Sequence, residues 1–241
     1  MNYAFAALST LCLWMPAPAH AGAWLQREGG GQAILTARYQ ASTPAKLEIN
    51  PLVEYGLSSR FTVGANLGYR AIDRDSGKSS LGYAELLGRY QILKGQSVLS
   101  VQGMAGSAAR GLNARADASL GVAEARVLWG TGFSLGSYGA GFVDAQTAFR
   151  SFFGKAGDEW RSELTLGWKF APGWMALAQG FHTENLRQDP TIYDYTSWQA
   201  QGSVVAPLGK GWFVQAGYNK TVGGARVRFD ANYFTAAWYA W

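Results

Sequence analysis

The sequence predicts an all-β fold: a single antiparallel up-and-down barrel of about 12 strands, within a range of roughly 10–14. Three observations predict it. Apolar and polar residues alternate through most of the chain, tight turns alternate with longer polar loops, and the alternation continues to the last residue, Trp241. Alternation with a period of two gives each strand one apolar face and one polar face.

The alternation is clearest in residues 60–72 and 160–170. In the first of these, Phe61, Val63 and Leu67 lie on one face, while polar or small residues occupy the other. The segments that we predict to be strands are 32–41, 46–57, 60–72, 79–92, 97–108, 117–129, 134–149, 160–170, 174–184, 195–206, 211–222 and 225–241.

The connections between these segments alternate in kind. Tight turns are expected at residues 58–59, 94–96, 130–132, 171–173 and 207–210. Longer polar loops are expected at residues 73–78, 109–116, 150–159 and 184–194, and the connections at 42–45 and 223–224 in this second class are short. Short periplasmic turns and longer extracellular loops are typical of outer-membrane barrels, and an even strand number returns both chain ends to the periplasm.

The N-terminus, residues 1–21, predicts a secretory signal peptide that is cleaved from the mature chain. A short apolar stretch precedes Ala19 and Ala21, which fit a cleavage site before Gly22, although the first residues contain no Lys or Arg. About 12 apolar residues are too few for a membrane anchor, since a spanning helix needs about 20. Cys12 is lost with this peptide, so the predicted mature chain has no thiol.

The rest of the chain is predicted to hold a periplasmic lead-in at residues 22–31, flexible at its glycines 29–31, and an outer-membrane barrel at residues 32–241. Glycine is abundant, with 31 residues, and proline is scarce, with 7. No apolar run is long enough for a transmembrane helix. The formal net charge is +5, but the basic residues are spread along the chain, which argues against a nucleic-acid partner.

Aromatic residues recur where the predicted tight turns end. Phe61, Trp174 and Trp212 each follow a turn on the apolar face, and Tyr239 and Trp241 close the last segment. Such rings anchor a barrel at the membrane interface. A soluble β-sandwich or lipocalin-like barrel also alternates, but it would place its aromatic residues inside. We therefore expect outer-membrane lipid and lipopolysaccharide around the barrel, and recognition of the C-terminal strand by the barrel-assembly machinery.

If the apolar faces meet lipid, the polar faces line a lumen. The candidate lumen-lining residues are Glu54, Arg70, Glu85, Arg89, Glu124, Arg126, Asp144, Arg161, Glu163 and Arg228. Acids and bases are mixed, and neighbouring strands are expected to place Glu54 beside Arg70, and Glu124 near Asp144 and Arg89. A charge in a narrow lumen of low dielectric must be paired or hydrated.

Two interpretations of this lumen stay open. The charges either form an ion-pair ladder that fills a small barrel, or they line a water-filled path for solutes. A barrel of eight strands is filled by side chains, and one of sixteen or more leaves a channel. A strand number of about 12 therefore does not distinguish a filled lumen from an open one. Leu87, Leu128, Met175 and Leu177 are expected to face inward and narrow the lumen. Such a pore would be non-selective or would weakly prefer anions.

His182 is the only histidine of the predicted mature chain, and therefore the only candidate base for a serine-type lipid enzyme. Residues 181–186 resemble the His-x-Ser-Asn segment of lipid A deacylases, but Glu184 stands where the nucleophilic serine would be. We therefore expect His182 to be a polar residue at the membrane interface, and we expect no enzyme.

No metal or cofactor is expected either. Asp73 and Asp75 are too few carboxylates for a calcium loop, and basic residues are interleaved with them. The glycines at 29–31 precede a strand and no helix follows, so they are not a phosphate-binding loop.

Residues 54–64 resemble a hairpin that recurs in small bacterial outer-membrane proteins grouped as transporters, which include the phenol-degradation-pathway family. Residues 84–90 are similar to the next strand of such proteins. The match is confined to these two segments and mostly encodes turns and strands. The resemblance implies a membrane barrel with a role in solute passage, and it carries over no functional residue.

We therefore expect passage of small solutes through a narrow charged lumen in the outer membrane of a Gram-negative bacterium. One alternative is a filled barrel that binds a partner through its loops at 150–159 and 184–194, with Phe152, Phe153, Tyr193 and Tyr195 as the contact surface. The other alternative is a lipid-modifying enzyme at His182.

Overall fold

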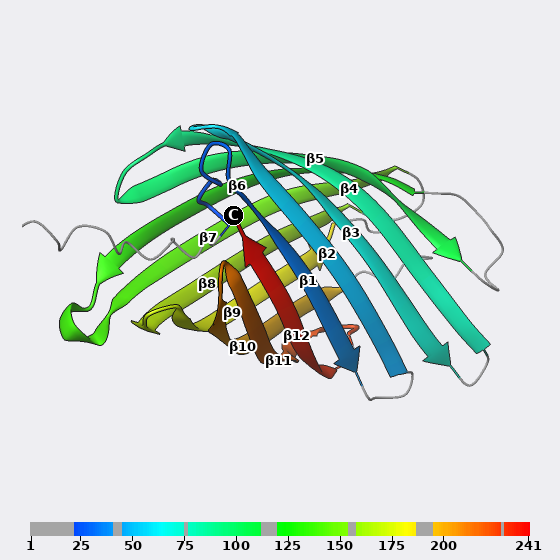
Figure 1. Ribbon diagram of the computed structural model, residues 1–241. Helices are drawn as coiled ribbons and strands as arrows, with labels where there is room; N and C mark the ends of the chain where they lie inside the picture. The colour runs from blue at the N-terminus through cyan, green and yellow to red at the C-terminus, as the bar shows by residue number, and fades with distance from the viewer. Residues whose placement is uncertain are drawn as a thin grey trace, which may run out of the picture.

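The computed structural model describes residues 22–40, 45–74, 77–111, 120–153, 158–186, 195–227 and 229–241. They form a closed barrel in which successive strands pair in antiparallel fashion (Figure 1). The strand β1 closes the barrel by pairing with β12, from Gln32 opposite Ala240 to Tyr39 opposite Tyr233. This arrangement confirms the predicted up-and-down barrel of about 12 strands, and closure leaves no sheet edge unpaired.

The strands are long enough to cross a membrane. Their bounds are β1 Gly31–Gln40, β2 Ala45–Ser58, β3 Phe61–Arg74, β4 Gly77–Leu93, β5 Ser97–Gly111, β6 Leu120–Ser134, β7 Ala140–Phe153, β8 Glu159–Ala171, β9 Trp174–Asn185, β10 Thr196–Gly209, β11 Trp212–Ala225 and β12 Ala231–Ala240. A transmembrane strand needs about 9–11 residues, and β1 and β12, the shortest strands, have 10 each. A 3-10 helix, η1, covers Gly136–Tyr138. Within the described ranges, no helix is long and apolar enough to cross a bilayer.

The turn predicted at residues 130–132 is wrong. These residues lie within β6, which continues to Ser134, and the chain reverses at η1 instead. Gly136 and Gly139 have φ angles of 62° and 98°, a region that favours glycine, so the actual turn uses the next pair of glycines. Glycine inside a strand marks the close approach of another group as readily as a turn.

The connection predicted at residues 223–224 is also displaced. Both glycines belong to β11, which ends at Ala225, and β12 begins at Ala231. The chain therefore reverses later than expected, beginning at Arg226, whose φ of 57° is left-handed.

The outward face of the barrel is apolar. Large hydrophobic side chains such as Leu67, Leu86, Leu164 and Val204 are exposed on it. They alternate along their strands with side chains that point into the lumen. A contiguous apolar exterior of this kind suits a hydrocarbon environment rather than water.

Aromatic side chains gather outside at the end of the barrel where the tight turns lie, which we call the turn end. Phe61, Trp174, Trp212 and Trp241 are between 36% and 48% exposed. The ring of Tyr239 lies 4.7 Å from that of Trp212 and 5.8 Å from that of Trp241, centroid to centroid. These residues share one end and the outer face, and their place at a membrane interface stays a prediction.

The lumen differs between its two ends. At the turn end it holds apolar side chains, including a cluster of Phe142, Met175, Leu177 and Val205. Toward the opposite end, which we call the loop end, inward side chains are mostly polar or charged. In the predicted orientation the turn end faces the periplasm and the loop end faces outside the cell.

Candidate functional site in the barrel lumen

Residues 22–30, which we call the plug, lie inside the turn end of the lumen before the chain enters β1 (Figure 1, dark blue). The buried Ala23 amide donates to the Asp144 carboxylate at 2.6 Å, and its carbonyl accepts a hydrogen bond from Ser100 at 2.7 Å. The Gln26 amide donates to Thr62 Oγ1 at 3.0 Å. These bonds tie the plug to β3, β5 and β7, so the segment predicted as a lead-in packs against the inner wall of the barrel.

Trp24 is the aromatic anchor of the plug. Its ring meets Phe142 edge to face, with centroids 5.9 Å apart, and packs on the cluster that contains Met175 and Leu177. It also packs on a second cluster, which contains Leu128. The predicted inward positions of Leu128, Met175 and Leu177 are thus confirmed, and the apolar side chains close the turn end by packing on Trp24.

Two strand glycines make room for the plug. A Cβ atom on Gly130 would lie 2.6 Å from the Trp24 ring. A Cβ atom on Gly56 would lie 2.1 Å from the Arg27 carbonyl oxygen, and Gly56 also exchanges backbone hydrogen bonds of 2.9 Å with Gly29 and Gly30. The glycine that suggested a turn in β6 therefore serves the close approach of the plug.

Gly130→Ala is expected to loosen the plug, because the added methyl group collides with Trp24 and Ala23. Overpacking of this kind costs about 1–3 kcal/mol. Trypsin should then cleave faster after the exposed Arg27 in the folded barrel. Gly103→Ala is the matched control, since a Cβ atom at Gly103 meets nothing within 4 Å. Equal cleavage rates in both variants would contradict the proposed packing.

A buried ion pair lies directly beneath the plug. Arg89 Nη2 donates to Glu54 Oε1 at 2.8 Å, and the two side chains are only 7% and 4% exposed. Gln26 and Gln32 donate to the other oxygen of Glu54, and Arg89 Nη1 donates to the Trp24 carbonyl at 3.2 Å. Both charges are therefore satisfied by hydrogen bonds to the barrel and the plug.

The expected pairing of Glu54 with Arg70 is wrong. The register of β2 and β3 places Glu48 opposite Arg70, and Glu54 opposite Gly64. Arg70 accordingly binds Glu48 at 2.7 Å. Side chains pair across a ladder when they are directly opposite, so the register and not the strand order selects the partner.

A second charged network spans the middle of the lumen. Arg126 binds Glu124 at 2.9 Å and Glu163 at 2.8 Å, and Arg150 reaches both Glu124 and Glu85. Glu124 was expected near Arg89, but its partners are Arg126 and Arg150, because β6 and β7 place Arg150 opposite Glu124.

Asp144 lies at the plug rather than in this network. Its carboxylate accepts from the Ala23 amide and from Gln146 Nε2, each at 2.6 Å. Gln146 in turn accepts from Arg126, so the plug and the middle network are joined by one chain of hydrogen bonds.

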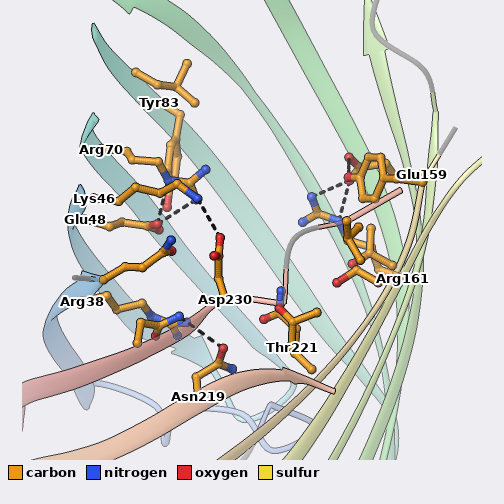
Figure 2. Close-up of a pocket in the computed structure, with 18 of the residues that line it drawn as sticks. Arg38, Lys46, Glu48, Arg70, Tyr83, Glu159, Arg161, Asn219, Thr221 and Asp230 are labelled. Carbon is orange, nitrogen blue, oxygen red and sulfur yellow. Dashed lines mark hydrogen bonds and ion pairs between the residues drawn. The ribbon is translucent and has the colours of Figure 1, made fainter. Parts of the chain in front are cut away.

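The loop end of the lumen is hollow. A cavity of about 780 Å³, which we call the vestibule, lies between the strands there (Figure 2). Figure 2 shows Lys46, Glu48 and Arg70 gathered on one wall, and Glu159 with Arg161 on another. A second cavity of about 410 Å³ shares several of its residues and reaches Glu163. The vestibule is therefore charged on more than one side.

Each wall of the vestibule is held by its own ion pair. Lys46 binds Asp230 at 3.2 Å, and Arg161 binds Glu159 at 2.5 Å. Glu159 also accepts a hydrogen bond of 2.6 Å from the hydroxyl of Tyr195, which precedes β10. Burial and the neighbouring Glu159 raise the pKa of the Tyr195 phenol, so Tyr195 stays a hydrogen-bond donor.

The structure places the candidate lumen residues at three depths. Glu54, Arg89 and Asp144 contact the plug, whereas Glu124, Arg126 and Glu163 lie in the middle network. Those that line the vestibule are Arg70, Glu85 and Arg161. Arg228 lies outside the described residues.

Sequence reasoning missed the plug as part of the site. The plug has no period-two pattern, so nothing in the alternation marked it. Its one signal is apolar content: Trp24 and Leu25 stand in a segment otherwise made of glycine, polar residues and alanine, and an exposed lead-in has no use for them.

His182 lies on the outer face. The β9–β10 register sets it opposite the exposed Trp198, and the two rings are 4.0 Å apart. It therefore belongs to the lipid side of the barrel. In the part of the chain that the structure describes, no group of three His, Cys, Asp or Glu residues could hold a metal ion. Of the carboxylates weighed for calcium, Asp75 lies outside the described residues.

No protein-family model matches the sequence, and no curated protein matches it. Solved structures do match over most of the chain. An outer membrane channel from Pseudomonas putida F1 is 10% identical, with a TM-score of 0.66 over 92% of this chain and 99% of that one.

Two further structures resemble this chain. The β domain of the Bordetella autotransporter BrkA is 18% identical, with a TM-score of 0.59 over 89% of this chain and 100% of that one. The KdgM porin is 8% identical, with a TM-score of 0.54 over 86% and 99%. At these identities the likeness concerns the fold, and the chain has the fold of small outer-membrane β-barrels.

Proposed function

We propose that this barrel is a narrow outer-membrane pore for small solutes, closed at the turn end by the plug. The proposal rests on the observation that a short chain segment helps to close the lumen at the turn end. The vestibule is a polar cavity of about 780 Å³, and what separates it from the turn end includes a short chain segment rather than strands alone. A segment held by a few hydrogen bonds and one aromatic anchor can move without opening the barrel wall.

The similar structures support this proposal through their fold. One is an outer membrane channel and one is a porin, whereas the BrkA domain belongs to an autotransporter. The hairpin at residues 54–64 adds its resemblance to transporter-type barrels of the phenol-degradation-pathway kind. That this chain belongs to these transporter-type barrels is part of the proposal.

The location in the cell is also proposed. The apolar exterior and the aromatic residues at the turn end support an outer membrane with lipid and lipopolysaccharide around the barrel. Residues 1–21, outside the described part of the chain, would act as the export signal. The C-terminal strand ending on Trp241 would be recognised by the barrel-assembly machinery.

The competing function is a filled barrel that binds a partner through its loops. The charged middle network and the plug favour it, because both fill the lumen. Of the contact residues expected in its loops, Phe152 and Phe153 lie in β7 instead, and Phe152 lines the vestibule. Tyr195 precedes β10, while Tyr193 lies outside the described residues. We propose no enzymatic function, since His182 packs on Trp198 on the outer face.

Planar-bilayer recording on the refolded mature chain tests the pore. Discrete conductance steps are expected, with brief openings when the plug is present and longer ones when it is removed. If neither the mature chain nor a chain without the plug conducts above a protein-free bilayer, the pore is excluded and the filled barrel remains.

A further inference from the structure

The ion pairs of the vestibule expose their basic members more than their acidic members. The side chain of Arg70 is 41% exposed, against 21% for its partner Glu48. Lys46 is 30% exposed, against 19% for Asp230. On this wall, the cation of each pair lies nearer to the open space.

On the opposite wall of the vestibule, the basic member of each pair is again more exposed than the acidic member. Arg161 is 30% exposed, against 9% for Glu159, and Arg150 is 13% exposed, against 2% for Glu85. These residues come from β7, β8 and β4, whereas the first wall is made by β2 and β3 together with Asp230. The asymmetry is therefore a property of the whole vestibule and not of one strand pair.

One pair deeper in the lumen has the opposite order. Glu163 is 28% exposed, against 12% for Arg126. Glu163 lines the smaller cavity, beside Asn50 and Phe181, and does not line the vestibule. The other deep pairs keep the order of the vestibule, since Arg126 and Arg150 are 12% and 13% exposed against 0% for Glu124. Among these pairs the exposed acid is therefore Glu163, and the cations with the largest exposed fractions, Arg70, Lys46 and Arg161, lie in the vestibule.

A solute in the vestibule meets this exposed basic layer first. Buried carboxylates behind it lower the net charge, but a contact at short range is dominated by the nearer group. Low-dielectric walls also focus the field into a cavity and reduce its screening by salt. This order of exposure favours a positive potential at the entrance, although acids and bases are nearly balanced in its lining.

We propose that the vestibule binds small hydroxylated carboxylates, of about the size of one sugar acid. The proposal deepens the pore function above by naming its solute class. Arginine forks such as those of Arg70 and Arg161 suit a carboxylate. Hydroxyl and amide groups of Tyr83, Thr183 and Gln199 line the same cavity and suit sugar hydroxyls. The cavity volume of about 780 Å³ is ample for one such solute.

Equilibrium binding to the refolded mature chain in detergent tests this without requiring conduction. Isothermal titration with glucuronate, glucose and glucosamine compares one ring shape in an anionic, a neutral and a cationic form. We expect glucuronate to bind tightest and its affinity to fall as NaCl is added. Equal affinities, tighter binding of glucosamine, or no binding of glucuronate would each overturn the proposal.

A matched pair of variants separates a binding role from a structural one. Arg70→Gln should weaken glucuronate binding about fivefold, and Glu48→Gln should strengthen it, because it removes the acid behind Arg70. Heat-modifiable migration on gels shows whether each variant folds. If Glu48→Gln weakens binding as much as Arg70→Gln, the pair only shapes the cavity and the proposal fails.

The two proposals fail separately. Reversal potentials across a KCl gradient, measured on a chain without the plug, should show a preference for chloride. A chain that binds glucuronate but never conducts contradicts the pore and leaves the binding site standing. A chain that conducts but does not bind glucuronate contradicts only the binding site.

Discussion

Deleting residues 23–28 is expected to raise the time-averaged conductance of the refolded barrel on the order of tenfold. The deletion removes Trp24, the residue on which both apolar clusters of the turn end pack. It also removes Gln26, which bridges Thr62 and Glu54. What remains at the turn end is the barrel wall, whose strands are paired around the whole circumference. The deletion should therefore open the lumen without opening the barrel.

Planar-bilayer recording measures this change, and two controls keep it specific. The truncated chain must still migrate as a folded, heat-modifiable barrel. A synthetic peptide of residues 22–30, added to the chamber on the turn-end side, should reduce the conductance again. If the truncated barrel folds but conducts no more than the intact chain, then the inward side chains close the lumen by themselves and the plug is not the gate.

Arg89→Met is expected to destabilise the barrel by about 3–5 kcal/mol, because it leaves the buried Glu54 without its cation. Both side chains of this pair are less than a tenth exposed, and Arg89 also binds Gln102 and the Trp24 carbonyl. Water cannot readily replace these contacts. Urea unfolding from lipid vesicles, followed by tryptophan fluorescence, measures the loss.

Arg70→Met is the matched control for this prediction. Arg70 also loses a carboxylate partner, Glu48, but its side chain is 41% exposed. Pairs in such surroundings contribute about 0–1 kcal/mol. Equal losses in the two variants would mean that burial does not set the strength of these ion pairs. Adding Glu54→Gln to Arg89→Met should recover part of the stability, since no unpaired charge then remains.

The strands could be predicted closely because their signal is local. In β3, the alternation of Phe61, Val63 and Leu67 with polar residues indicates which face meets lipid. This pattern does not depend on the rest of the chain. Some errors came from the loop end, where the strands run further than expected: β3 ends at Arg74 and β4 begins at Gly77, within the loop predicted at residues 73–78. Others came from glycine. Gly130 resembles a turn residue in sequence, but it is a strand residue that makes room for Trp24, and no local pattern distinguishes the two uses.

The site was less predictable, because its pairs depend on register and depth. A shift of one residue between β2 and β3 would place Leu47 or Ile49 opposite Arg70 instead of Glu48, and strand order alone does not state that register. The exposed fraction of each charge depends on the curvature of the whole barrel, so the basic layer of the vestibule has no signature in the composition.

The sequence by itself determined the barrel, its approximate strand number, its apolar exterior and its polar lumen, because period-two alternation is set by neighbouring residues. Only the tertiary structure decided that residues 22–30 fill the turn end, that Glu54 pairs with Arg89, and that the cations stand in front of their acids. These features join groups far apart in the chain, such as Ala23 and Asp144. Their physical cause is the closure of the barrel, which places distant strands around one small lumen. The lumen then determines which oppositely charged side chains lie close enough to pair.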